Sequence, residues 1–308
     1  MEIYRTTKDI NKNRPSALAL GFFDGLHLGH TTLLDKCIEF ARERGYSADV
    51  FTFRDHPKNV LSGEMLVPRI ITESEKLLKL SALGIDRVFD FDFTESFHKM
   101  PPEEFARDLL AEAFAVKAVF CGFNFRFGAD ASGTPATLKD LGNTYDFETH
   151  VIEPVCVGDN LVSSSLIRSC INSGDVGSAS SLLGREYSLG GSVQMGRRLG
   201  RILGFPTANI VPDKSLTLPA NGVYITETLV GGVLYPSISN IGVRPTINDL
   251  GSVSIETHLL DFDGDLYGSY LSVQFKTMIR EERHFENEEH LRRQIAIDTE
   301  KARQFFST

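Results

Sequence analysis

Two histidines lie in a glycine-rich segment near the start of the chain. The segment, Gly21–His30, reads Gly-Phe-Phe-Asp-Gly-Leu-His-Leu-Gly-His. The apolar run Ala17–Leu20 precedes it as a predicted buried strand, and a helical apolar pattern follows it. Such a strand-to-helix turn can bind phosphate through backbone N–H groups and the positive end of the helix. His27 and His30 share one helical face, where they suit an anion whose charge grows during reaction. The alternative is a tight turn with two surface histidines.

Two further segments are expected at the same edge of the sheet. The loop Gly122–Gly128 follows a predicted strand, and in it Arg126 could pair with phosphate while aromatic neighbours pack on a planar ring. The serines Ser163–Ser165 can cap a helix whose first turn presents Arg168 for a bidentate grip on phosphate. The alternatives are a partly buried aromatic loop and a plainly capped helix with a surface arginine.

The second half of the chain carries oxygen ligands and one isolated carboxylate. Thr207 and Asn209 are two apart in an extended segment, so their oxygens can point the same way and suit a Mg²⁺ ion that keeps several waters. The alternative for this pair is a loop followed by a strand start. Glu256 lies mid-strand among apolar neighbours. It either faces solvent or faces a pocket, where it would act as a general base.

Strand and helix patterns alternate from Ala17 to about Val155. After the first strand, the predicted elements are a strand over Ser47–Phe53, a helix opened by a capping box at Thr72–Glu75 and ending near Gly84, a strand over Arg87–Phe93, a helix over Pro102–Phe114 and a strand over Val116–Gly122. This alternation predicts a parallel sheet with helices on both faces. Ligands of such folds bind beyond the carboxyl ends of the strands.

The pattern changes after Tyr187 to short strands without intervening helices. These strands are predicted over Gly191–Met195, Gly222–Leu229, Val233–Ser239, Val253–Leu260 and Leu271–Met278, and a helix follows over Glu288–Phe306. The series predicts a closed antiparallel barrel with a C-terminal helix. A short helical connector over Gly174–Leu183 precedes the change. We therefore expect two domains, 1–185 and 186–308.

Composition limits the function classes. The net charge of −9 and the pI of about 5.4 argue against general nucleic-acid binding. The four cysteines show no metal-binding spacing and suit a reducing compartment. The N-terminus lacks the apolar core of a signal peptide, and no apolar run is long enough to span a membrane. These features predict a cytoplasmic protein.

The motifs occur in an order that resembles the prokaryotic bifunctional riboflavin kinase/FAD synthetase family. The first half matches through the turn at Gly21–His30, the loop at Gly122–Gly128 and the serine-arginine helix start at Ser164–Arg168. The second half matches through the segments Gly200–Asn209, Asn240–Thr246, Glu256–Phe262 and Leu266–Gly268. The resemblance implies a Rossmann-like nucleotidyltransferase domain with a parallel sheet, then a riboflavin-kinase-type β-barrel.

The resemblance also implies residue roles. His27 and His30 would stabilise charge on ATP phosphates, with Ser164 and Arg168 holding pyrophosphate. The other residues implied in nucleotide binding are Gly21, Phe23, Asp24, Gly29, Gly200 and Thr207. Those implied in flavin binding are Asn124, Phe125, Arg126 and Arg280. Thr207 and Asn209 would contact Mg²⁺, and Glu256 would be the catalytic base of the kinase.

The expected function is phosphorylation of riboflavin to FMN and adenylylation of FMN to FAD, with ATP and Mg²⁺ used in both steps. We expect riboflavin, FMN and ATP as partners, no nucleic acid or membrane, and a monomer or a weak homo-oligomer. Two alternatives stay open: a nucleotidyltransferase for another phosphorylated acceptor, and a flavin-binding sensor without turnover.

Overall fold

The computed structural model describes residues 1–8, 10–195, 204–246 and 249–307, with 243–246 and 249–252 as backbone only. It contains two compact units, Met1–Ser164 (unit 1) and Ser165–Thr308 (unit 2). Each unit holds one of the two predicted architectures. These units are defined by contacts within the chain, whereas the boundary predicted near Arg185 separates two functional modules. That functional boundary stays a prediction.

Unit 1 is built on a six-stranded parallel sheet with the strand order β1-β4-β3-β2-β5-β6. The strands are β1 (Glu2–Tyr4), β2 (Ser16–Leu20), β3 (Ser47–Phe53), β4 (Arg87–Phe91), β5 (Val116–Gly122) and β6 (Glu148–Ile152), and a two-stranded ribbon consists of β7 (Cys156–Val157) and β8 (Asn160–Leu161). All residues of β2 are buried, because helices cover the sheet on both faces. The predicted strands β3 and β5 have the predicted bounds.

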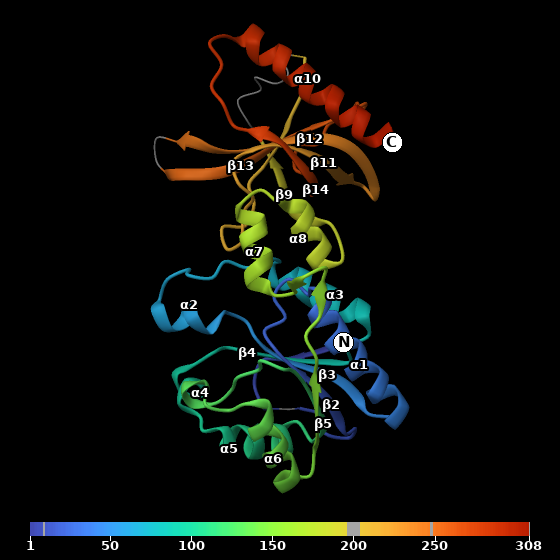
Figure 1. Ribbon diagram of the computed structural model, residues 1–308, viewed down its shortest axis with the longest axis vertical. Coiled ribbons are helices and arrows are strands. Elements are labelled where there is room, and N and C mark those ends of the chain that lie inside the picture. Colours follow the sequence, from blue (N-terminus) through green and yellow to red (C-terminus); the bar gives the residue numbers. More distant parts are fainter. Residues whose placement is uncertain (9, 196–203, 247–248, 308) are drawn as a thin grey trace. The chain divides into compact units, whose positions relative to one another are not determined.

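The helices of unit 1 connect the strands, and Figure 1 shows their arrangement. They are α1 (Leu28–Arg44), α2 (Pro57–Ser62), α3 (Glu73–Leu83), α4 (Glu95–Lys99), α5 (Pro102–Glu104), the π-helix η1 (Phe105–Ala113), the 3₁₀ turn η2 (Ala129–Ala131) and α6 (Pro135–Tyr145). The predicted capping box opens α3, with Thr72 as N-cap and Glu75 bonding back to it. The helix predicted over Pro102–Phe114 continues from α5 as η1, whose wider turns bury Phe105, Leu109, Leu110 and Ala113 as expected.

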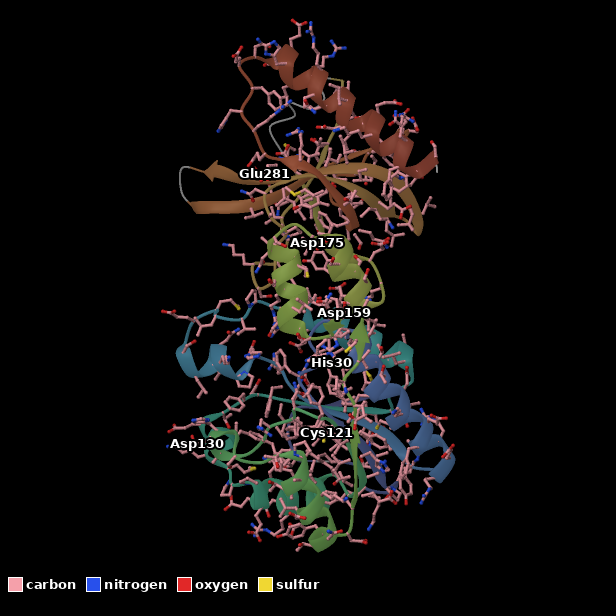
Figure 2. The ribbon with its side chains drawn as sticks, viewed as in Figure 1. His30, Cys121, Asp130, Asp159, Asp175 and Glu281 are labelled. Atoms are coloured by element: carbon pink, nitrogen blue, oxygen red, sulfur yellow. The ribbon has the colours of Figure 1, made fainter. Side chains whose placement is uncertain are left out.

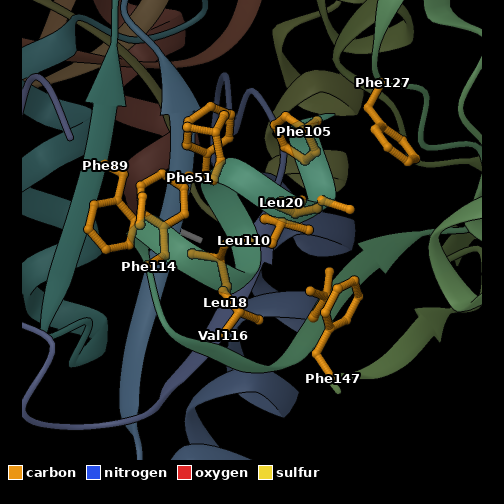
Figure 3. Close-up of a cluster of buried hydrophobic side chains, with 14 of the residues drawn as sticks. Leu18, Leu20, Phe51, Phe89, Phe105, Leu110, Phe114, Val116, Phe127 and Phe147 are labelled. Carbon is orange, nitrogen blue, oxygen red and sulfur yellow. The ribbon is translucent and has the colours of Figure 1, made fainter. Parts of the chain in front are cut away.

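Aromatic side chains fill the space between η1 and the sheet. Phe51, Phe89 and Phe114 gather at one side of this cluster, and Phe89 stacks on Phe114 at 4.1 Å (Figure 3). Cys121 of β5, labelled in Figure 2, belongs to the same cluster, and burial raises the pKa of its thiol to about 11. Such packing fixes the strands that carry the loops at the carboxyl edge.

Unit 2 contains a closed antiparallel barrel in the order β10-β13-β12-β11-β14-β9, as predicted. Its elements are β9 (Tyr187–Gln194), β10 (Ala208–Ile210), β11 (Gly222–Val230), β12 (Val233–Thr246), β13 (Asp249–Leu259), β14 (Tyr270–Glu281) and the helices α7 (Ser164–Asn172), α8 (Val176–Leu183) and α10 (Glu288–Ser307). α8 packs against β9 and β14. α10 covers the barrel at Ile225 and Ile238 through Ala302.

Five hydroxyl groups form a buried line inside the barrel. Its order is Thr228, Ser237, Thr226, Ser239 and Thr257, and four hydrogen bonds of 2.8–2.9 Å join neighbours along it. All five side chains are buried. The barrel interior is therefore partly polar, and each of these hydroxyls is hydrogen-bonded to at least one neighbour on the line.

Candidate active sites

The strand order of unit 1 creates a topological switch point. From β2 the sheet continues through β3 on one side and through β5 on the other. The turn Gly21–His27 and the loop Gly122–Gly128 follow these neighbouring parallel strands. Both segments therefore lie at the carboxyl edge of the sheet, where folds of this kind bind ligands. The structure brings together two segments that the sequence singled out separately.

The backbone of the turn is strained. Phe23 and Leu26 have φ angles of 53° and 43°, and Gly25 has a φ of 81°. A Cβ atom at Gly21 would lie 3.0 Å from the Phe23 ring. Two non-glycine residues in the left-handed region cost on the order of 1–3 kcal/mol each, and such residues concentrate at functional sites.

Two side chains predicted to bind nucleotide brace this turn. The buried Asp24 carboxylate accepts the Ile70 N–H at 2.9 Å, and the Ser164 hydroxyl donates to the Asp24 carbonyl at 3.0 Å. In the same region the Thr52 hydroxyl donates to the Phe22 carbonyl at 3.0 Å. These contacts hold the strained conformation, so Asp24 and Ser164 act on the turn itself.

The two histidines lie together at the start of α1. His27 is the N-cap, and its Nδ1 accepts the His30 N–H at 3.3 Å. The rings stack with centroids 3.6 Å apart, and Gly29 leaves room for this because its Cβ would lie 3.3 Å from the His27 ring. His30 is labelled in Figure 2. Both rings therefore lie at the N-terminal, positive end of the α1 dipole.

The His30 ring is neutral at pH 7. Burial, and then the neighbouring His27, hold the pKa of His30 well below its ordinary value. Its buried Nδ1 has no hydrogen-bond partner among the residues that the structure describes. A neutral imidazole stabilises developing charge as a dipolar N–H donor. Any stabilisation of negative charge by the His30 ring would therefore come from its oriented N–H group and not from a full positive charge.

The loop after β5 divides into an anchored part and an exposed part. Phe127 is buried, and Phe125 stacks on it with ring centroids 5.8 Å apart. Asn124 and Arg126 are exposed, as is Phe123 at 42%. Of the residues predicted to bind flavin here, Phe125 is thus half-buried against the core, whereas Asn124 and Arg126 face outward.

Arg168 belongs to unit 2, because α7 continues into that unit from Ser164. Its side chain is half-buried. Its contact with phosphate stays a prediction.

Lys76 is buried near the turn, and none of the predicted site roles falls on it. Its Nζ lies 3.3 Å from the Phe53 carbonyl, 3.8 Å from Asp90 Oδ1 and 5.4 Å from the centre of the Phe22 ring. Burial lowers the pKa of Lys76. Its position in the first turn of a capped helix resembles that of any surface lysine, so the sequence offers no signal of burial.

In unit 2 the strand register aligns three polar side chains. Asn209 of β10 and Asn240 of β12 both stand opposite Glu256 of β13. Directly opposed residues share one face of a sheet. Asn209 is buried, and its Oδ1 has no hydrogen-bond partner among the described residues. Such an orphan carboxamide oxygen, two residues along the chain from the Thr207 hydroxyl, is of the hard oxygen type that Mg²⁺ prefers.

A cavity of about 490 Å³ adjoins this row. Thr207, Glu256 and Arg280 line it from the barrel, and Phe285 and Leu291 line it from the C-terminal segment. Its volume is that of a small-molecule site. Of the two orientations considered for Glu256, the structure gives the one that faces a pocket.

Arg280 has a structural contact in the wall of this cavity. Its Nε donates to Oδ2 of the buried Asp298 carboxylate of α10 at 2.9 Å, and its Nη2 lies 2.9 Å from the same oxygen as an ion pair. Gln294 donates to the other oxygen at 2.7 Å. The guanidinium also lies 5.7 Å from the centre of the Phe285 ring. The residue predicted to bind flavin thus also holds α10 on the barrel.

Some predicted residues lie outside the description. Gly200 and the basic segment around it fall in the undescribed range 196–203. Among described residues, no cluster of three or more histidine, cysteine, aspartate or glutamate side chains could hold a metal ion. The Mg²⁺ site predicted at Thr207 and Asn209 stays a prediction.

The two halves of the chain match two different protein families. Residues 9–166 match the family described as FAD synthetase, and residues 183–306 match the family described as riboflavin kinase. The bifunctional riboflavin kinase/FMN adenylyltransferase of Escherichia coli (strain K12) is 36% identical over 94% of this chain and 92% of its own length. This chain belongs to that bifunctional family. The member from Bacillus subtilis (strain 168) is 34% identical over 95% of this chain and 93% of its own length.

A solved structure has the same fold. It is described as a macrolide-efflux protein from Streptococcus pneumoniae, with a TM-score of 0.90, 30% identity and 98% coverage of both chains. The family matches confirm the predicted family, and with the observed strands they confirm the predicted fold class. In the described part of the chain, no helix is both long enough and apolar enough to cross a membrane.

Proposed function

We propose that this chain phosphorylates riboflavin to FMN at the barrel cavity and adenylylates FMN to FAD at the carboxyl edge of the parallel sheet, with ATP as co-substrate in both reactions. The observation that carries the proposal is the register that sets Asn209 opposite Glu256, whose side chain lines a cavity of about 490 Å³. This register places a possible proton acceptor, Glu256, opposite a carboxamide oxygen that could bind Mg²⁺. The cavity beside Glu256 is large enough for a small-molecule substrate.

In the kinase step, Glu256 accepts the proton of the riboflavin 5′-hydroxyl as that oxygen attacks the γ-phosphorus of ATP. ADP leaves with the electron pair of the broken P–O bond. Mg²⁺, held by the Thr207 hydroxyl and the Asn209 carboxamide oxygen, would supply charge neutralisation at the phosphates. Phe285 and Leu291 supply the apolar wall for the flavin ring.

In the adenylyl transfer, a phosphate oxygen of FMN attacks the α-phosphorus of ATP, and pyrophosphate leaves. The attacking oxygen is already ionised at pH 7, so catalysis consists mainly of positioning and charge stabilisation. The N–H groups of His27 and His30 and the start of α1 stabilise the transition state. Ser164 and Arg168 hold pyrophosphate, and Asn124 and Arg126 orient the flavin nucleotide.

The remaining proposals concern the setting of the enzyme. It works in the cytoplasm as a monomer or a weak homo-oligomer, and it binds no nucleic acid. Size-exclusion chromatography at two protein concentrations tests the oligomeric state.

Two substitutions on the full chain separate the activities. Riboflavin and Mg-ATP are supplied, and riboflavin, FMN and FAD are resolved over time. Glu256→Gln should slow FMN formation by roughly a hundred- to ten-thousandfold and leave FAD formation from supplied FMN intact. His30→Ala should slow FAD formation by about a hundredfold and leave the kinase intact. A parent chain that binds flavin but consumes no ATP would contradict the proposal.

A further inference from the structure

The segment that carries Thr207 is held by a side chain on the neighbouring strand. The ladder between β10 and β13 pairs Ala208 with Thr257 and Asn209 with Glu256, so one step earlier Thr207 stands opposite His258. At this step the main-chain ladder has ended, because β10 begins at Ala208. The His258 ring takes over, with its Nδ1 2.8 Å from the Pro206 carbonyl oxygen.

This hydrogen bond has one possible direction. A carbonyl oxygen only accepts, so Nδ1 of His258 carries the proton and donates it. The donor is present whether the ring is neutral or protonated. The Phe205 ring also packs edge-on against His258, with centroids 5.5 Å apart and planes at 89°. One side chain therefore fixes two consecutive residues just before Thr207.

The Pro206 carbonyl is an effective place to hold the segment. Proline has no N–H, so the carbonyl is its only main-chain hydrogen-bonding group. That carbonyl belongs to the planar peptide unit that ends at the Cα atom of Thr207. Fixing its oxygen therefore sets the direction from which the Thr207 side chain leaves the backbone. Thr207, Glu256 and His258 all line the cavity.

From this geometry we infer that His258 is a positioning residue of the kinase site, which aims the Thr207 hydroxyl at the metal and the phosphates of ATP by holding the Pro206–Thr207 peptide. The inference rests on the proposed kinase function. Partners that orient a metal ligand typically contribute 10- to 100-fold to metal affinity or activity.

Two substitutions of His258 distinguish positioning from chemistry. In His258→Asn the amide nitrogen is bonded to Cγ, as Nδ1 is, and so can keep the donor. In His258→Gln the amide is one atom further out, near the position of Nε2, and the donor to Pro206 is lost. Riboflavin phosphorylation by the full chain is followed while Mg²⁺ is varied at fixed ATP. FAD formation from FMN by the same protein reports that unit 1 is intact, and thermal melts report folding of unit 2.

We expect His258→Gln to raise the half-saturating Mg²⁺ concentration about 10- to 100-fold, and His258→Asn to restore it to within about threefold of the parent. Adding Thr207→Ala to His258→Gln should cost no more than Thr207→Ala alone, because the two residues act as one unit. Equal Mg²⁺ dependence in the parent and His258→Gln would overturn the inference. An equal loss of kcat in both His258 variants at unchanged Mg²⁺ dependence would also overturn it, because the ring itself would then be needed. A parent without kinase activity would overturn the proposed function and this inference with it.

Discussion

Replacing Asp298 tests how α10 is held on the barrel. Asp298 is 1% exposed, accepts one hydrogen bond each from Arg280 and Gln294, and forms an ion pair with the Arg280 guanidinium at 2.9 Å. Breaking a buried pair by removing one partner costs about 3–5 kcal/mol. Because the Arg280 side chain keeps 18% of its exposure and can reach water, we place Asp298→Ala at the low end, about 3 kcal/mol. At roughly 3 °C per kcal/mol for a unit of this size, the unfolding midpoint of unit 2 should fall by about 10 °C.

The same helix provides a matched control. Arg303 of α10 pairs with Asp261 through two bonds of 2.7 Å, and both side chains are largely exposed, at 46% and 72%. Arg303→Ala should leave the midpoint unchanged, because exposed pairs contribute little. Differential scanning calorimetry of the full chain measures both variants, and riboflavin binding should weaken in Asp298→Ala alone. If Asp298→Ala had the same unfolding midpoint as Arg303→Ala, the buried pair would not be what holds α10 on the barrel, and the reasoning would be wrong.

Three further predictions follow from burial and packing. The pKa of His30 is depressed in the folded chain, so the unfolded chain binds more protons than the folded chain below about pH 6.5. Unit 1 should therefore lose stability as the pH falls through that value. Urea unfolding at about pH 7.5 and about pH 5.5 measures this loss, which should be smaller in His30→Gln than in the parent. Iodoacetamide should label the exposed Cys156 in the native chain well before the buried Cys121, and mass spectrometry of the peptides checks the order. A fragment over 175–308 should have a higher unfolding midpoint than a fragment over 183–308, because only the longer one keeps the buried face of α8. Both fragments should phosphorylate riboflavin. If both fragments folded but were inactive, the first half of the chain would be needed to complete the kinase site.

Much of the fold could be predicted from local sequence. The bounds of β3 and β5 were predictable because these short segments, rich in apolar residues, lie between turn signals. Thr72 marks the start of α3 through a reciprocal cap. The edge strands β1 and β6 were missed. Both are short and partly exposed, and pairing with a neighbour is what makes them strands.

The barrel strands show where local patterns fail. β12 runs to Thr246, well beyond the predicted end at Ser239, although its sequence contains Gly242 and Pro245. Pairing with β13 carries the strand through these residues, and that partner lies later in the chain. The three-residue β10 (Ala208–Ile210) lies in the segment that was expected to be extended, but it was not predicted as a strand of the barrel.

The residue types of the candidate sites could be predicted, but their pairings could not. The position of Asn209 opposite Glu256 depends on the order of strands in a closed barrel, which no spacing along the chain reveals. Likewise, burial of Lys76 and the hydrogen bond from His258 to Pro206 arise only when distant segments meet. Tertiary packing decides such contacts.

The line of hydroxyls inside the barrel has a consequence that comes from counting protons. Five hydroxyls carry five protons, but four bonds use only four of them. One proton is always spare, and which hydroxyl carries it defines the direction of every bond along the line. Moving the spare proton from Thr228 to Thr257 requires only rotation about C–O bonds, with no proton exchanged. The barrel therefore encloses a small electric dipole that can reverse without any atom of the backbone moving.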